Sequence, residues 1–143
     1  MKPVRRRRNS GFTLIEVLLV LVILVVLASL AVVNYMGATR RANINAAKVQ
    51  VDLFSTALDT YQTGVGVYPS TAGGLQALRS PPADLQSPDK WDGPYLMKDV
   101  PPDPWGKQYE YCCPGQHNPD RFDVWTTGPE NQVIGNWSEE MHK

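Results

Sequence analysis

The sequence predicts an α+β fold in which one long N-terminal α-helix packs on a small antiparallel β-sheet, with a loop-rich C-terminal region. Three observations support this. No proline occurs between residues 4 and 68, so nothing in that stretch forces a helix to end. An apolar run covers residues 12–33. From residue 69 on, frequent prolines and glycines separate short strand candidates.

The run over residues 12–33 is apolar apart from Thr13, Glu16 and Ser29. At about 1.5 Å per residue it is roughly 33 Å long, which matches the thickness of a bilayer core. Arginines at positions 5–8 precede it, so the positive-inside rule places residues 1–11 in the cytoplasm and the remainder across the membrane. The run is too long for an ordinary secretory signal. A plain signal anchor fits better but leaves Glu16 unexplained.

Glu16 is a carboxylate inside a segment that otherwise suits lipid. Insertion scales set the cost of an acidic residue at the bilayer centre at roughly 2.5–3.5 kcal/mol. Either a partner amine neutralises the carboxylate, or the side chain reaches the interface from the first helical turn. Both explanations remain open at this point.

Residues 34–64 continue the helix with an amphipathic pattern. Apolar residues recur every three or four positions and form one stripe: Ile44, Ala47, Val51, Phe54, Leu58 and Tyr61. Gly64 and Gly66 mark the expected end. A helix of about 50 residues would be roughly 75 Å long, so its apolar half requires a bilayer or identical neighbours.

Residues 65–143 form a globular head. Residues 72–79 suit a short helix capped by Ser70 or Thr71, with Leu75 and Leu78 facing inward. Residues 108–112 and 122–126 are strand candidates. The adjacent Cys112 and Cys113 are expected on opposite faces of the first strand, without a redox or metal role.

The charge pattern argues against nucleic acid as a partner. The formal net charge is zero, but residues 1–11 hold five of the fourteen basic residues and none of the fourteen acidic ones. Without residues 1–11 the formal net charge of the chain is −5, and an acidic protein is not expected to bind nucleic acid. The two histidines, His117 and His142, fall in an expected surface loop and at the C-terminus, and no hydrolase, zinc or phosphate-loop motif occurs. We therefore expect no enzymatic activity.

The segment Gly11-Phe12-Thr13-Leu14-Ile15-Glu16, after a basic leader and before an apolar run, resembles the class III signal of type IV pilins and pseudopilins. The resemblance implies a type IV pilin-like fold. It also implies that a prepilin peptidase cuts between Gly11 and Phe12 and that Phe12 is then N-methylated. Glu16, the fifth residue after the cut, would pair with the new terminal amine of a neighbouring subunit and fix the register of a filament.

Blocks in the head are similar to the major pseudopilins of type II secretion systems. They are Tyr68-Pro69-Ser70-Thr71, Gly93-Pro94-Tyr95-Leu96, Asp103-Pro104-Trp105-Gly106 and Ile134-Gly135-Asn136-Trp137. The resemblance implies an inner-membrane protein with a periplasmic head, extracted into a periplasmic filament that drives the export of folded proteins. The implied partners are further copies of the chain, prepilin peptidase, minor pseudopilins, the assembly platform with its ATPase, the outer-membrane secretin and membrane lipid. The alternatives are a major type IV pilin, a minor pseudopilin or a competence pseudopilin.

One departure concerns calcium. The family has a long acidic loop that binds Ca²⁺ before the Ile-Gly-Asn-Trp block, whereas this chain has only residues 128–133 there. Ca²⁺ takes six to eight oxygen ligands. The weak candidates are Asp123, Glu130 and Asn131. We therefore expect packing of Trp125 or Trp137 to hold this loop, rather than a metal.

Overall fold

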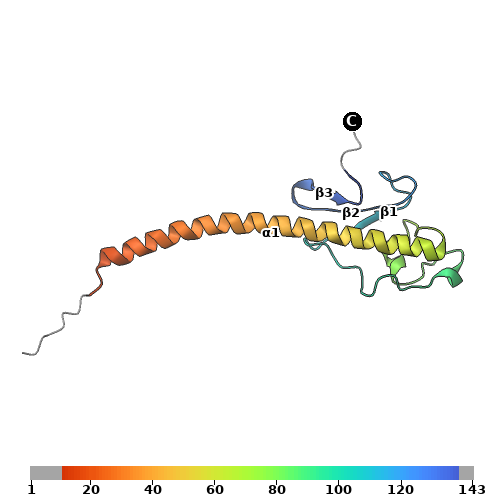
Figure 1. Cartoon of the computed structure of the whole chain (residues 1–143), viewed down its shortest axis with the longest axis horizontal. Helices are drawn as coiled ribbons and strands as arrows, with labels where there is room; N and C mark the ends of the chain where they lie inside the picture. The colour runs from red at the N-terminus through yellow and green to blue at the C-terminus, as the bar shows by residue number, and fades with distance from the viewer. Residues whose placement is uncertain (1–10, 139–143) are drawn as a thin grey trace, which may run out of the picture. The chain divides into compact units, whose positions relative to one another are not determined.

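The computed structural model describes residues 11–138, except for the side chains of residues 30–34. The predicted leader up to residue 10 and His142 lie outside the described residues. The chain consists of two compact units, and the boundary between them lies between Arg40 and Arg41. Figure 1 shows the order of the elements. They are the helix α1 (Leu14–Val65), the 3₁₀ helices η1 (Gly74–Leu78), η2 (Pro88–Lys90) and η3 (Pro129–Asn131), and the strands β1 (Glu110–Cys112), β2 (Asp123–Thr127) and β3 (Val133–Gly135).

The predicted α+β class and the long helix are confirmed. Helix α1 has 52 residues and ends at Val65, directly before Gly66, which has a φ of 94°. A residue in this left-handed region stops an α-helix, and glycine adopts it without a steric penalty. In the first unit, the side chains described from Leu14 to Ser29 and from Tyr35 to Arg40 are all exposed. Among the described residues, no helix is long and apolar enough to cross a membrane.

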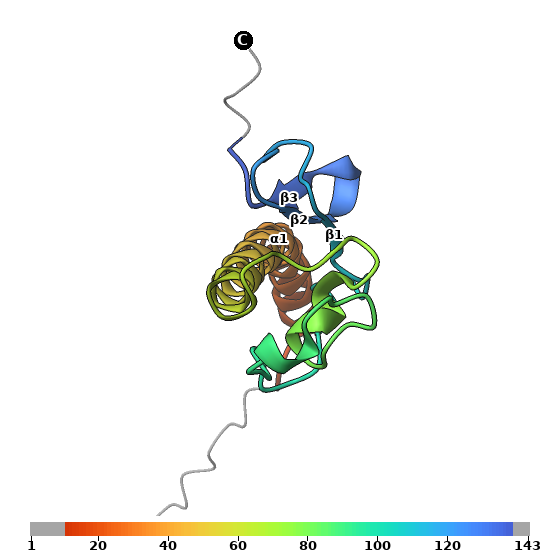
Figure 2. The same cartoon turned by 90° about the vertical axis from the view of Figure 1, so that its right-hand side faces the viewer.

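The core of the second unit forms around the predicted helical stripe. Ala47, Val51, Phe54, Leu58 and Tyr61 are buried, and Ile44 is half-buried. The cluster extends to residues from the rest of the unit: Leu75, Leu78, Tyr109, Phe122 and Val124. Figure 2 shows the sheet on one side of the C-terminal part of α1 and the segment with η1 and η2 on another. The head is therefore built around the helix.

The sheet has three antiparallel strands in the order β1-β2-β3. β1 and β2 lie close to the predicted strands, but β3 was not expected to be a strand. Trp125 on β2 pairs with Glu110 on one side and with Gly135 on the other. β2 is thus the central strand.

The short helix predicted over residues 72–79 differs from expectation. It is a 3₁₀ helix of five residues, because Gly74 at its start has a φ of 55°, outside the right-handed helical region. Leu75 and Leu78 face inward as predicted. The predicted cap at Ser70 or Thr71 is wrong, because Gly73 is the N-cap and no side chain caps the helix. The Ser70 hydroxyl accepts a hydrogen bond from the Gly73 N–H at 3.0 Å and so supports the turn that precedes the helix.

Candidate functional site

The predicted processing site lies just ahead of α1. Gly11, Phe12 and Thr13 precede the helix, which begins at Leu14. The Thr13 hydroxyl accepts a hydrogen bond from the Glu16 N–H at 3.3 Å, and its carbonyl accepts from the N–H groups of Glu16 and Val17 at 3.1 and 3.4 Å. Thr13 is therefore the N-cap, a role that our sequence analysis missed. The spacing Thr-x-x-Glu, typical of a capping box, was the available signal.

Glu16 lies in the first turn of α1 and is exposed. A carboxylate at this position interacts favourably with the partial positive charge of the helix N-terminus. Among residues 11–138, no side chain forms an ion pair or hydrogen bond with the Glu16 carboxylate. Phe12 is 84% exposed, and the large apolar side chains that follow on α1 are also exposed. The first unit thus presents an apolar surface with one unpaired carboxylate.

In the head, Asp123 organises the turn that follows β1. Its side chain is only 1% exposed and sits at the start of β2. Its oxygens accept hydrogen bonds from the N–H groups of Gln116, His117 and Asn118 at 2.7, 2.8 and 3.1 Å, and from Asn118 Nδ2 at 2.9 Å. His117 Nδ1 lies 3.0 Å from Oδ2. Burial opposes ionisation, but the hydrogen bonds from His117, Asn118 and Gln116 outweigh it and lower the pKa of Asp123.

This arrangement does not fit the calcium site that the family implies. The lone pairs of Asp123 are already used by donors of the 116–118 turn, so the carboxylate has little capacity for a cation. Glu130 and Asn131 lie in η3, beyond the other end of β2. At about 3.3 Å per residue, the length of β2 alone separates them from Asp123 by roughly 13 Å, far beyond a Ca²⁺–oxygen distance of about 2.4 Å. Within residues 11–138, no three acidic, His or Cys side chains gather around a metal-sized site.

A second buried carboxylate, Asp103, organises the turn before β1. Oδ1 accepts hydrogen bonds from the N–H groups of Trp105 and Lys107 at 2.9 and 2.7 Å, and Oδ2 accepts from the Thr126 hydroxyl on β2. Burial opposes ionisation here as well, but these bonds outweigh it and lower the pKa of Asp103. Asp103 therefore connects the 103–107 turn to the central strand.

Trp105 packs against the short loop of residues 128–133. We had expected Trp125 or Trp137 to hold this loop. A Cβ atom on Gly128 would lie 3.0 Å from the Trp105 ring, so ring and loop backbone are in close contact. Trp137 instead packs on Gly135 and stacks on His117, with ring centroids 3.9 Å apart and planes 4° apart. His117 is at the surface, as predicted, but its ring contacts both Trp137 and the Asp123 carboxylate.

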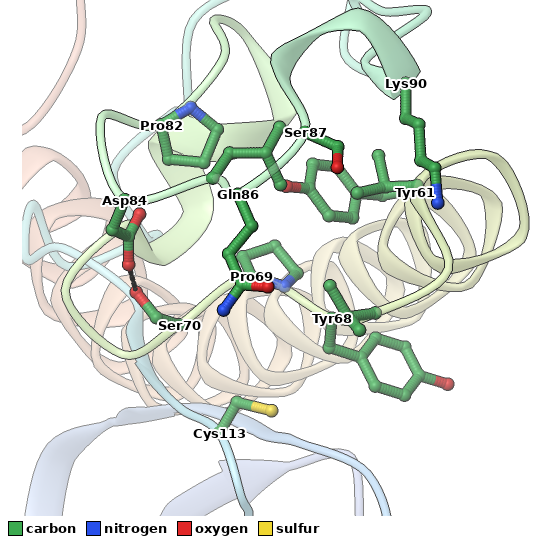
Figure 3. Close-up of a pocket in the computed structure, with 13 residues that line it drawn as sticks. Tyr61, Tyr68, Pro69, Ser70, Pro82, Asp84, Gln86, Ser87, Lys90 and Cys113 are labelled. Atoms are coloured by element: carbon green, nitrogen blue, oxygen red, sulfur yellow. Dashed lines mark hydrogen bonds between the residues drawn. The ribbon is translucent and has the colours of Figure 1, made fainter.

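The two cysteines line two separate cavities of the head. A cavity of about 390 Å³ lies between the end of α1 and the 82–90 segment, with Tyr61, Lys90 and Cys113 in its wall (Figure 3). The Tyr61 hydroxyl in this wall is buried and has no hydrogen-bond partner among the described residues. Cys112 lines a separate cavity of about 330 Å³ beside His117 and Trp137. The two free cysteines thus line different cavities, but both are half-buried and Cys113 lies beyond the end of β1, so the predicted alternation of one inward and one outward cysteine on a strand is wrong.

The chain is similar to known proteins over nearly its whole length. The family model described as type II secretion system (T2SS), protein G matches residues 34–141, and a prokaryotic N-terminal methylation motif matches residues 6–32. The chain is 38% identical over 142 residues to the type II secretion system core protein G of Pseudomonas aeruginosa, covering 94% of this chain and 99% of that protein. It is 40% identical over 138 residues to the protein of that name from Klebsiella pneumoniae, covering 92% and 96%.

A solved structure is also similar. The crystal structure of the major pseudopilin from the type 2 secretion system of enterohaemorrhagic Escherichia coli superposes with a TM-score of 0.62 at 32% sequence identity. The match covers 73% of this chain and 94% of that one. Sequence and structure comparisons therefore indicate the same family.

Proposed function

The chain belongs to the protein G family of the type II secretion system, and from this premise we propose that it is the structural subunit of a periplasmic pseudopilus. Copies of the chain polymerise through their N-terminal helices, and the filament drives export of folded proteins across the outer membrane. It acts as a structural protein and not as an enzyme, with force supplied by its partners.

One observation carries this proposal: the side chains described from Leu14 to Ser29 in the first unit are all exposed and almost all apolar. Leu18, Leu21 and Leu24 are 47%, 53% and 55% exposed, and the exposure continues around the helix. Exposed apolar surface of this extent marks an interaction site with protein or lipid. Identical helices side by side would bury it, and repetition of one such contact builds a filament.

We assign processing to Gly11 and Phe12. Prepilin peptidase cuts between them, and the new amino group of Phe12 is methylated. The N-terminal methylation motif matched at residues 6–32 supports this assignment. Neither residue is enclosed: both are exposed, and a Cβ on Gly11 would meet no atom within 4 Å. Both residues of the bond are therefore open to a peptidase.

Glu16 has the role of an assembly residue. Its carboxylate has no partner within the described chain, whereas cleavage creates a terminal amine four residues away on every copy. Bringing the carboxylate of one subunit to the amine of the next neutralises both charges in an apolar surrounding, where each alone is costly. Because the pair forms only at one axial offset, it sets the stagger between neighbouring subunits.

Before assembly the subunit is stored in the inner membrane, with residues 12–33 as the anchor, residues 1–11 cytoplasmic and the head periplasmic. The described residues include no helix that qualifies as a membrane span, so this proposal rests on the sequence alone, on its apolar run and basic leader. The remaining partners are minor pseudopilins, the assembly platform with its ATPase and the outer-membrane secretin.

The test has two measurements on cells that carry the secretion system. Mass spectrometry of the membrane-extracted chain should find an N-terminus at Phe12 that carries one methyl group. Removal of the chain should leave exoproteins in the periplasm, and its re-expression should restore both their release and the pseudopili seen by electron microscopy. Normal secretion without the chain would refute the proposed function.

A further inference from the structure

The hairpin that joins β2 to β3 closes through its own hydrogen bonds. Thr127 pairs with Val133, and the Gly128 N–H donates to the Gln132 carbonyl at 2.9 Å. The Gln132 N–H in turn donates to the Pro129 carbonyl at 3.2 Å. Glu130 and Asn131 have φ values of 59° and 58°, which reverse the chain between these bonds. Backbone hydrogen bonds therefore join the two ends of the loop.

A second set of contacts fixes the hairpin to the 103–107 turn. Lys107 Nζ donates a hydrogen bond to the Thr127 carbonyl at 3.2 Å, directly before the loop begins. The Trp105 ring covers Gly128, which is buried. Both residues are held in place by the Asp103 carboxylate, which accepts their N–H groups.

These contacts stabilise the loop in the way that a bound metal ion would, by pairing its oxygen atoms with a positive charge or with hydrogen-bond donors. A divalent cation stabilises a loop by attracting carbonyl and carboxylate oxygens. Here the Lys107 ammonium donates to the Thr127 carbonyl at the loop entrance. The buried carboxylate of Asp103, beside the loop, already accepts N–H and O–H donors. Asp123, at the far end of β2, is satisfied in the same way by N–H donors. A cation would have to displace these donors to bind.

We propose that Lys107, Trp105 and Asp103 lock the β2–β3 hairpin of this chain, so that the head keeps its full stability without calcium. This separates the chain from the calcium-binding pattern that its family resemblance implies. The inference concerns unfolding and not secretion, so its test is independent of the proposed function.

The experiment measures thermal unfolding of the full-length chain in detergent micelles by near-ultraviolet circular dichroism. Samples contain either CaCl₂ or an excess of EGTA, for the wild type, Lys107→Met and the control Lys98→Met, which removes an exposed lysine outside the turn. The wild-type Tm should be the same in CaCl₂ and EGTA. Lys107→Met should lower Tm by about 3 °C in both, because one charge-assisted hydrogen bond at the surface is lost, and Lys98→Met should not change it.

Three results would overturn the proposal. A wild-type Tm that rises clearly in CaCl₂ would show that the hairpin binds the cation after all. Equal Tm values for Lys107→Met and Lys98→Met would show that the ammonium does not lock the loop. Restoration of the Lys107→Met protein by CaCl₂ alone would likewise reveal a cation site and count against the proposal.

Discussion

Arg121 Nη2 donates hydrogen bonds to both carboxylate oxygens of Asp59, at 2.6 and 2.7 Å. Asp59 lies on α1 and Arg121 lies in the turn before β2, 62 residues further along the chain. The Tyr68 hydroxyl also donates to Asp59, at 2.8 Å. The contact attaches the turn between β1 and β2 to the helix around which the head is built.

We expect Arg121→Ala to lower the free energy of unfolding by about 1 kcal/mol or less. Both side chains are half-exposed, at 50% and 48%, so solvent weakens their attraction. The loss should shrink in high salt because exposed ion pairs are screened. Urea unfolding of the full-length chain in detergent at low and high salt measures this. Lys48→Ala, an exposed basic residue on α1, is the control. If the two variants lose the same stability, the Asp59 contact contributes nothing.

Replacement of Glu16 should separate assembly from processing. Glu16→Gln keeps the size of the side chain but removes its charge, so it cannot neutralise a partner amine. Cleavage and membrane insertion should remain normal, while the yield of pseudopili seen by electron microscopy falls at least tenfold. Asp52→Asn removes an exposed carboxylate from the same helix, within the head, and serves as control. A filament yield unchanged by Glu16→Gln would refute the role of the charge in register.

Gly11→Ala should block cleavage and leave the precursor uncut. A Cβ on Gly11 meets no atom within 4 Å, so the chain itself tolerates the methyl group, and any effect must arise in the peptidase site. Gly37→Ala is a matched control, since Gly37 also has no neighbour within 4 Å. Immunoblots should show a larger Gly11→Ala product and a Gly37→Ala product of mature size. Mature-sized Gly11→Ala protein would contradict the assigned cleavage site.

Asp123 should make stability depend on acid pH. Its pKa is lower in the folded state than in the unfolded one, so its contribution is complete above about pH 4 and is lost as the pH falls through the folded-state pKa. Asp123→Asn should cost about 2–3 kcal/mol at neutral pH, because a buried acceptor of several hydrogen bonds is altered. The cost should decrease as the pH falls below about 4. Urea unfolding against pH tests this, with the exposed Asp120→Asn as control. A cost that stays constant with pH would contradict it.

The long helix could be predicted from sequence because its signals are local. Absence of proline, a stripe with helical spacing and glycines at its end are all read within one or two turns, and the structure agrees from Ala47 to Val65. The N-cap Thr13 was also readable, from its spacing to Glu16. The start, the end and the buried stripe of α1 can thus be predicted from residues that are close together in the sequence.

The head was less predictable because its contacts join distant segments. β3 has only three residues, one of them Gly135, and becomes a strand only through pairing with β2. Asp123 was a weak candidate for the calcium site that the family resemblance implies, but three of its partners are backbone N–H groups, which no side-chain pattern reveals. Likewise Trp105, and not a tryptophan close to the loop in sequence, covers Gly128.

Two tyrosines of the head, Tyr61, which is buried, and Tyr111, which is half-buried, should respond differently to loss of their hydroxyl groups. The Tyr61 hydroxyl is buried and has no partner in the part of the chain that the structure describes, whereas the Tyr111 hydroxyl donates to the Pro69 carbonyl at 2.8 Å. An unpaired buried polar group costs about 1–3 kcal/mol, so Tyr61→Phe should leave the free energy of unfolding unchanged or raise it by about 1 kcal/mol. Tyr111→Phe should lower it by about 1 kcal/mol, since the Pro69 carbonyl loses its donor. Each variant is the control for the other, because both delete one hydroxyl and keep the ring. An equal loss in both, measured by urea unfolding, would show that a water molecule in the 390 Å³ cavity already satisfies Tyr61.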